Sequence, residues 1–123
     1  MPKTTASETK TLIIMDALIA TIIKKNLGLE IASTTIAQTF SEVESAITKD
    51  QFQLIITDLF VDGINVSDYL EFLNTALPDS SIVVLTEVNV AKFQSEVEKQ
   101  GIEEYIKLPI ALDALKLKLK KYL

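Results

Sequence analysis

The chain has 123 residues, of which 48% are hydrophobic and 24% charged, a balance that fits one globular domain. The formal net charge is −5 and every basic residue is a lysine, which argues against a nucleic-acid-binding surface. Cysteine and histidine are both absent, which excludes disulfides, thiolate metal sites and the commonest general base, so any chemistry must rest on carboxylates, hydroxyls, lysines and the backbone.

Residues 1–10 lack the apolar core of a signal peptide. We expect them to form a short disordered lead-in. No apolar run reaches the roughly 18 residues that a membrane span requires. We therefore expect a cytoplasmic protein with no membrane partner, whose domain covers residues 11–123.

Four short apolar runs predict β-strands, and the first three are continuous rather than alternating. Continuous runs of this kind are typical of strands that are covered on both faces, as in a parallel sheet. A weaker strand-like run lies between the first two, at residues 33–38. The four runs are residues 11–15 (TLIIM), 53–57 (QLIIT), 81–85 (SIVVL) and 104–108 (EYIKL).

Helical patterns occupy the intervals between these runs. Residues 17–28 are expected to form a helix that ends at Gly28. Its apolar face is expected to consist of Ile19, Ile22, Ile23 and Leu27. The next helix, residues 41–49, opens with Ser41 and Glu44 in the spacing of a capping box.

Three more helices are predicted toward the C-terminus. Residues 67–78 carry an apolar stripe and end at Pro78, and residues 89–101 run from a capping Asn89 to Gly101. Residues 109–123 alternate leucine with lysine, which alone suggests a strand, but their length and the early proline favour a helix. The stripe of residues 67–78 consists of Tyr69, Leu70, Leu73 and Leu77.

The strict alternation of strand and helix predicts an α/β fold with a parallel sheet and helices on both of its faces. We expect a flavodoxin-like doubly wound five-stranded sheet of strand order 2-1-3-4-5 in a single (βα)5 domain. In such sheets ligands bind at the carboxyl ends of the strands. Asp16 follows the first strand, Asp58 the third and Thr86 the fourth, so we expect these side chains to lie together. Two neighbouring carboxylates repel unless a cation lies between them, and a cation that prefers oxygen ligands, such as Mg²⁺, suits this position.

This arrangement resembles the receiver domain of two-component response regulators, over nearly the whole chain from about residue 11 to residue 123. The resemblance implies that Asp58 accepts a phosphoryl group from a histidine kinase. It implies Mg²⁺ ligands at Asp16, Asp58 and the backbone carbonyl of Phe60. It also implies that Thr86 contacts the phosphoryl group and acts as a switch together with Tyr105.

The sequence departs from the family pattern at four places near this site. Met15 stands where the family carries a further acid, which should weaken the metal site, and Leu108 stands where it carries a lysine. Lys107 lies one residue early and should point away from Asp58, unless a bulge before Pro109 turns it back. The other two departures are Glu87, in place of a small residue, and Val61-Asp62, in place of Met-Pro.

Two functions follow from the resemblance. The first is a phosphorelay receiver, with no enzymatic activity beyond self-phosphorylation from a phosphohistidine donor and slow autodephosphorylation. Its expected partners are a sensor histidine kinase or phosphotransfer protein, an unknown output protein, and a second copy bound through residues 89–101, 104–108 and the C-terminal helix. The alternative is a degenerate pseudo-receiver that acts as a phosphorylation-independent protein-interaction module.

Two other α/β enzymes are rejected on sequence. A phosphatase of the haloacid dehalogenase type needs a second aspartate two residues after the first, and that position is Phe60. A flavodoxin-type flavin site needs a phosphate loop rich in hydroxyl groups and glycine after the first strand. Residues 15–22 (MDALIATI) do not form such a loop, because they contain a single hydroxyl residue and no glycine.

Overall fold

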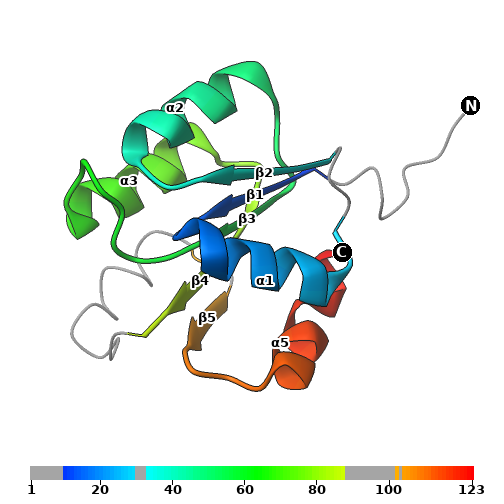
Figure 1. Ribbon diagram of the computed structural model, residues 1–123. Helices are drawn as coiled ribbons and strands as arrows, with labels where there is room; N and C mark the ends of the chain where they lie inside the picture. Colours follow the sequence, from blue (N-terminus) through cyan, green and yellow to red (C-terminus); the bar gives the residue numbers. More distant parts are fainter. Residues whose placement is uncertain (1–9, 30–32, 88–101, 103) are drawn as a thin grey trace, which may run out of the picture.

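The structure, a computed structural model, describes residues 10–29, 33–87, 102 and 104–123. Its five strands are all parallel and form one sheet in the order β2-β1-β3-β4-β5 (Figure 1), which confirms the predicted fold class and strand order. The strands are β1 (Thr11–Ile14), β2 (Thr34–Ala37), β3 (Leu54–Thr57), β4 (Ser81–Thr86) and β5 (Glu104–Lys107).

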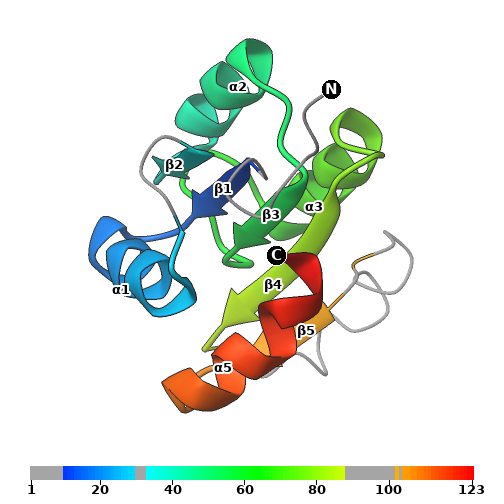
Figure 2. The same ribbon diagram turned by 90° about the vertical axis from the view of Figure 1, so that its right-hand side faces the viewer.

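Four α-helices lie in the described part of the chain, with α1 and α5 on one face of the sheet and α2 and α3 on the other (Figures 1 and 2). The helix predicted for residues 89–101 lies outside the described residues, as does most of the predicted lead-in, residues 1–9. The helices are α1 (Ala17–Leu27), α2 (Phe40–Lys49), α3 (Val66–Ala76) and α5 (Leu112–Leu119), followed by the 3₁₀ turn η4 (Lys120–Tyr122).

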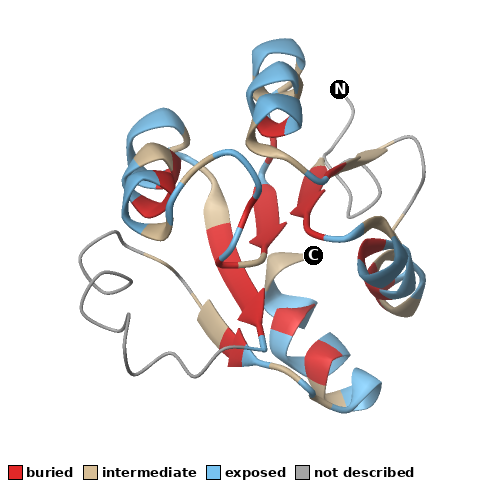
Figure 3. Ribbon diagram, turned by 60° about the vertical axis from the view of Figure 1, so that its left-hand side comes forward, coloured by how far each residue is buried: buried red, intermediate tan, exposed pale blue. Residues whose placement is uncertain are grey.

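The core has two layers, one on each face of the sheet, because side chains of a strand alternate between faces. On β1, Ile13 packs on the α1 and α5 side, whereas Leu12 and Ile14 pack on the α2 and α3 side. The central strands β1 and β3 are buried along their whole length (Figure 3), as the continuous apolar runs predicted. The outer faces of the helices are exposed, and in the described residues no helix has the length and apolar character to cross a bilayer.

The first helix begins and ends where the sequence indicates. Asp16 is its N-cap, and Gly28 ends it with a φ of 68°, a left-handed conformation that glycine adopts without strain. The predicted apolar face is wrong in part. Ala20, Ile23 and Leu27 are buried, but Ile19 and Ile22 are exposed, so α1 carries a second apolar face toward solvent. The helix packs on the sheet through a narrow stripe, and the sequence does not reveal which apolar stripe is used.

The capping residues predicted for α2 are also wrong. Thr39 is the N-cap, its hydroxyl accepting the backbone N–H of Glu42 at 3.2 Å. The Glu42 carboxylate in turn accepts the backbone N–H of Gln38 at 2.6 Å. The spacing of a capping box is present, but it begins two residues before Ser41, because the helix itself starts at Phe40.

The ambiguous C-terminal segment is helical. Leu115 and Leu119 are buried in the core layer on the α1 and α5 side of the sheet, whereas Leu117 is 73% exposed. A strand would have placed all three leucines on one face, so this exposure pattern follows directly from the helical period.

Candidate functional site

The register of the two central strands determines which residue lies beside Asp58. Ile14 of β1 is the partner of Thr57 of β3, and the backbone N–H of Asp58 donates to the carbonyl of Ile14 at 2.9 Å. Met15 is therefore level with Asp58, and Asp16 lies one residue further along. The sequence correctly placed strands 1 and 3 side by side, but the residue opposite Asp58 is the buried Met15 rather than Asp16.

A cavity of about 220 Å³ opens at the carboxyl ends of the strands. Asp58 and Thr86, at the ends of β3 and β4, both line it, as expected for residues at this edge of a parallel sheet. Most of its wall is apolar, and the part of the wall that the structure describes includes no lysine. The lining residues are Met15, Ile19, Asp58, Phe60, Leu85, Thr86, Glu87 and Leu108.

The carboxylate of Asp58 is held on one side only. Its Oδ1 accepts the backbone N–H of Leu59 at 2.6 Å and that of Phe60 at 3.3 Å. Its Oδ2 has no hydrogen-bond partner among the residues that the structure describes. Backbone hydrogen bonds at one oxygen orient the other one, so Asp58 presents a fixed, half-buried carboxylate to the cavity.

Asp16 has a different environment. Its side chain is exposed and is not part of the cavity wall. Its Oδ2 caps α1 by accepting the N–H groups of Leu18 at 3.0 Å and Ile19 at 3.3 Å. Asp16 is therefore a helix cap, and its Oδ1 has no hydrogen-bond partner among the described residues.

Asp16 and Asp58 are the candidate metal ligands at this edge of the sheet. Each of Asp16 and Asp58 keeps one carboxylate oxygen that forms no hydrogen bond within the described residues. Mg²⁺ commonly binds through one or two carboxylates and retains several waters. The described residues contain no group of three or more acidic side chains that could hold a metal ion.

Thr86 and Glu87 line the same cavity at different depths. Thr86 is buried, with 1% of its surface exposed, at the last position of β4. Glu87 is exposed and lies at the cavity wall. The cavity therefore carries two carboxylates, Asp58 and Glu87, and the negative charge of Glu87 is well hydrated.

Leu108 rather than Lys107 is directed to the cavity. Lys107, the last residue of β5, is exposed, and its ammonium group donates to the carbonyl of Leu108 at 3.4 Å. Ile106 packs with Leu108 on the α1 and α5 side of the sheet, so Lys107 has the opposite orientation. In this structure the cationic side chain of β5 is therefore turned away from Asp58.

Tyr105 lies on β5 within electrostatic reach of Asp58. Its hydroxyl is buried and has no hydrogen-bond partner in the described part of the chain. Burial first, and then the negative charge of Asp58, raise the pKa of Tyr105 from 10.0 to about 12. This side chain is thus sensitive to the charge state of Asp58, although no hydrogen bond joins the two.

A pair of buried hydroxyls that was not predicted from the sequence lies beside Asp58. The Tyr69 hydroxyl of α3 lies 2.7 Å from the Thr57 hydroxyl of β3, and both residues are fully buried. Burial raises the pKa of Tyr69 well above its usual range, the hydrogen bond with Thr57 partly offsets this increase in pKa, and the charge of Asp58 adds to it. A threonine directly before Asp58 in an otherwise aliphatic strand was the available signal, but its partner lies 12 residues later, on a helix.

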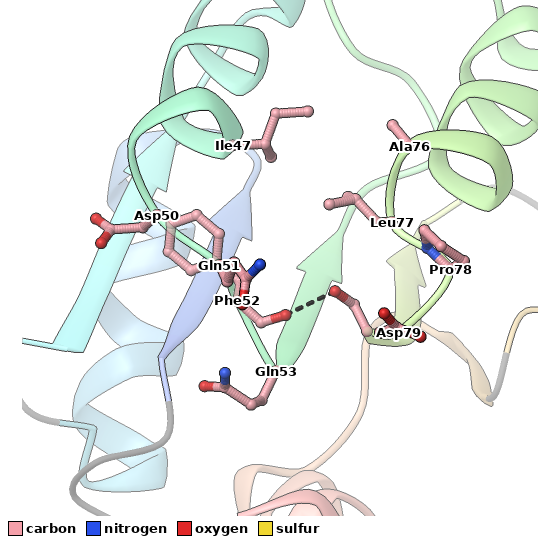
Figure 4. A pocket seen from close by; sticks show the side chains of 10 residues that line it. Ile47, Asp50, Gln51, Phe52, Gln53, Ala76, Leu77, Pro78 and Asp79 are labelled. Atoms are coloured by element: carbon pink, nitrogen blue, oxygen red, sulfur yellow. Dashed lines mark hydrogen bonds between the residues drawn. The ribbon is translucent and has the colours of Figure 1, made fainter.

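A second cavity, of about 250 Å³, lies at the opposite edge of the sheet, where β3 and β4 begin (Figure 4). Ile47 at the end of α2 and Leu77 at the end of α3 project toward each other across it. The Ser80 hydroxyl donates to the carbonyl of Phe52 at 2.6 Å beside it. None of the site residues predicted from the sequence lies in this second cavity.

Comparisons by sequence return nothing. No model of a protein family matches the chain, and no curated protein matches it.

Comparison with solved structures identifies the fold. The chain is similar to a response regulator receiver domain (CheY-like) from Methanospirillum hungatei JF-1, with a TM-score of 0.80, 23% identity, and coverage of 92% of this chain and 91% of that one. It is also similar to the beryllofluoride-activated NtrC4 receiver domain dimer, with a TM-score of 0.77, 20% identity, and coverage of 92% and 94%.

A third similar structure is a response regulator from Burkholderia pseudomallei, which contains a phosphorylated aspartic acid, a calcium ion and citrate. Its TM-score is 0.73 at 21% identity, with 87% of this chain and 64% of that chain covered. At these identities the similarity establishes the fold: the chain has the receiver-domain fold of response regulators.

Proposed function

We propose that the chain is a receiver domain of phosphorelay signal transduction in which Asp58 is the phosphoacceptor. The observation that carries this proposal is the position of Asp58. Asp58 follows the central strand β3 and lines a cavity at the carboxyl edge of the sheet, where ligands bind in folds of this kind, and the buried Thr86 lines the same cavity.

The reaction that suits this geometry is nucleophilic attack by a carboxylate on phosphorus. The Oδ2 atom of Asp58 forms a new P–O bond, the P–N bond of a phosphohistidine breaks, and the imidazole leaves with its electron pair and takes up a proton. The N–H groups of Leu59 and Phe60 hold Oδ1 during this exchange. We assign the Thr86 hydroxyl to contact the transferred phosphoryl group, and Tyr105 to respond to the change in charge.

The carboxylates of Asp16 and Asp58 and the backbone carbonyl of Phe60 are the proposed ligands of Mg²⁺. When bound, the ion neutralises part of the phosphoryl charge. Met15 in the cavity wall supplies no ligand oxygen, so we expect weak binding of the metal. In this role the protein catalyses only its own phosphorylation and dephosphorylation, and it acts in the cytoplasm.

A protein phosphodonor has to approach Asp58 through a rim of exposed apolar side chains, and we propose a sensor histidine kinase or phosphotransfer protein as this partner. Ile19 and Phe60 line the cavity and are 37% and 51% exposed. Leu18 and Ile22 extend this surface along α1. We refer to Leu18, Ile19, Ile22 and Phe60 as the rim. Desolvation of these side chains would favour binding of the donor.

We also propose two further partners, an output protein and a second copy of the chain. An output protein is needed to read the state of the domain. Homodimerisation through β5 and α5 is also proposed, and the remaining part of that surface, residues 89–101, lies outside the described residues.

The proposal is tested by incubating the protein with Mg²⁺ and acetyl phosphate and measuring its intact mass. The wild-type protein should gain one phosphoryl group, and Asp58→Asn should gain none. Omission of Mg²⁺ should suppress the modification. A wild-type protein that stays unmodified over a range of millimolar Mg²⁺ concentrations would refute phosphoacceptor function.

One observation favours a second candidate function, a phosphorylation-independent interaction module. Leu108 and Met15 make the cavity wall apolar, and the described wall has no cation to neutralise a phosphoryl group. This alternative predicts that partner binding is the same for wild type and Asp58→Asn, with or without phosphodonor. A difference in partner affinity between these samples would exclude it.

A further inference from the structure

We propose that the hydroxyls of Tyr69 and Thr57 form a buried relay that positions Asp58, which makes both of them positioning residues for its reaction. This inference rests on the proposed function for its kinetic consequence. Its structural basis is independent of that function, because it consists of hydrogen bonds within the core.

The direction of the relay is determined by the number of protons. The Thr57 hydroxyl donates to the backbone carbonyl of Asp58 at 2.8 Å. A hydroxyl has only one proton to donate, so in the 2.7 Å contact between the two hydroxyls the proton must come from Tyr69. The chain of donors thus runs from Tyr69 to Thr57 and ends on the carbonyl of Asp58.

With the relay, every polar group of Asp58 except the carboxylate oxygen Oδ2 forms a hydrogen bond within the residues that the structure describes. The backbone N–H of Asp58 donates to Ile14 at 2.9 Å, and its carbonyl accepts from Thr57. One carboxylate oxygen accepts from Leu59 and Phe60. Fixing both adjoining peptide groups restricts the direction in which the second carboxylate oxygen points, which is the requirement for a well-oriented nucleophile.

The relay is itself anchored by packing. Tyr69 is fully buried and its ring lies edge-on to Phe40, with ring centroids 6.4 Å apart and an interplanar angle of 88°. The backbone N–H of Phe40 donates to the carbonyl of Asp62 at 2.8 Å, in the loop that follows Asp58. A single cluster therefore supports both Asp58 and the loop beside it. Removal of the Tyr69 hydroxyl would loosen the nucleophile but leave the aromatic packing in place.

The test compares variants that each remove one hydroxyl and little else. Tyr69→Phe and Thr57→Val break the relay, and Thr57→Ser keeps a hydroxyl at the same position. Tyr122→Phe is the matched control, because it also removes a tyrosine hydroxyl from a hydrogen bond, here to Glu104 at 3.1 Å. Thermal unfolding of each variant establishes that it is folded at the assay temperature.

The kinetic measurement is the rate of Asp58 phosphorylation as a function of acetyl phosphate concentration at constant Mg²⁺. We expect Tyr69→Phe and Thr57→Val to lower the saturating rate by about 3-fold to 10-fold without changing the half-saturating concentration, since the nucleophile is misaligned but donor binding is not affected. Thr57→Ser should retain most of the rate, and Tyr122→Phe all of it. The double variant should lose no more than Thr57→Val alone, because the hydroxyls act in series.

The second measurement does not depend on phosphorylation. In ¹H–¹⁵N spectra, Tyr69→Phe should shift the amide signals of Asp58, Leu59 and Phe60, whereas Tyr122→Phe should leave them in place. Wild-type rates together with unshifted signals in Tyr69→Phe would overturn the relay. If the wild-type protein is not phosphorylated, the proposed function fails, and the amide shifts alone then decide whether the relay exists.

Discussion

Asp58 and Leu108 line the same cavity, one from the end of β3 and the other from the residue that follows β5. An isobutyl group therefore occupies the wall position from which a longer side chain would reach toward the carboxylate. Lys107, the adjacent cation, is exposed and bonded to the backbone. The net charge of the cavity thus depends on whether Leu108 or Lys107 points into it.

Leu108→Lys should introduce an ammonium group into this cavity. A charge-assisted contact to a phosphoryl group worth about 1.4 kcal/mol in the transition state corresponds to roughly a tenfold higher rate of Asp58 phosphorylation. The rate with acetyl phosphate, followed by intact mass, is the measurement. Lys107→Ala serves as the control and should leave the rate unchanged. An equal response to both substitutions would contradict the orientation described for β5.

Ile22→Glu should separate donor docking from chemistry. Ile22 is 46% exposed on α1 and is not part of the cavity wall. A charge at this position should slow transfer from a protein phosphodonor, by about tenfold if one apolar contact of about 1.5 kcal/mol is lost. The rate with acetyl phosphate should not change. Leu117→Glu on α5, also exposed, is the control surface and should affect neither rate.

Alkaline pH should destabilise the fold through Tyr105. Since the pKa of Tyr105 is raised from 10.0 to about 12 in the folded protein, the unfolded chain loses this proton first as the pH rises. The contribution of Tyr105 to stability is therefore complete below its unfolded pKa and decreases as the pH approaches the folded pKa. Urea unfolding at several alkaline pH values should show a smaller decrease in the free energy of unfolding for Tyr105→Phe than for wild type.

The same group reports on Asp58. Asp58→Asn removes a negative charge that raises the pKa of Tyr105, so this pKa should be lower in the variant. Tyrosinate absorbance as a function of pH measures it, and Tyr105→Phe identifies the signal among the three tyrosines. An unchanged titration of Tyr105 in Asp58→Asn would show that the two side chains are not electrostatically coupled.

Gly63→Ala should destabilise the loop that follows Asp58. Gly63 has a φ of +100°, where an L side chain is strained, and an added methyl group would lie 3.4 Å from the Cβ atom of Phe40. We expect a loss of about 1–3 kcal/mol in the free energy of unfolding, measured in urea. Gly28 also has a positive φ, +68°, but an added methyl group there would meet nothing within 4 Å. Gly28→Ala should therefore lower the free energy of unfolding by less than Gly63→Ala. A larger loss at Gly28 would contradict this assignment.

The fold was predictable from the sequence because the apolar runs are short, continuous and evenly separated by helical patterns. The alternation predicted a parallel sheet, but it is compatible with more than one strand order. The expected order 2-1-3-4-5 is the one that the structure has. The helical faces were less predictable. Helix α1 has three isoleucines, and only Ile23 is buried, whereas Ile19 and Ile22 are exposed. The orientation of α1 on the sheet determines which of them is buried. Periodicity identifies an apolar face, but two overlapping faces on one helix cannot be ranked without the packing.

The sequence was sufficient to predict which edge of the sheet carries Asp58 and Thr86, but not which residue of β1 lies opposite Asp58. The sequence located Asp58 and Thr86 at one edge of the sheet, and both line the cavity there. It did not reveal that Met15 is level with Asp58, because a one-residue difference depends on the pairing of β1 with β3. The contact between Thr57 and Tyr69 was hidden for a related reason, since it joins a strand to a helix 12 residues later.

A crystal structure of the protein with Mg²⁺ and beryllofluoride tests the central claim most directly, because this phosphoryl mimic binds a phosphoaccepting carboxylate. The account predicts beryllofluoride on the Oδ2 atom of Asp58, in contact with the Thr86 hydroxyl, with Leu108 against it and Lys107 outside the cavity. A structure obtained at millimolar Mg²⁺ and beryllofluoride in which the Asp58 carboxylate carries no ligand would contradict the assignment of Asp58 as phosphoacceptor.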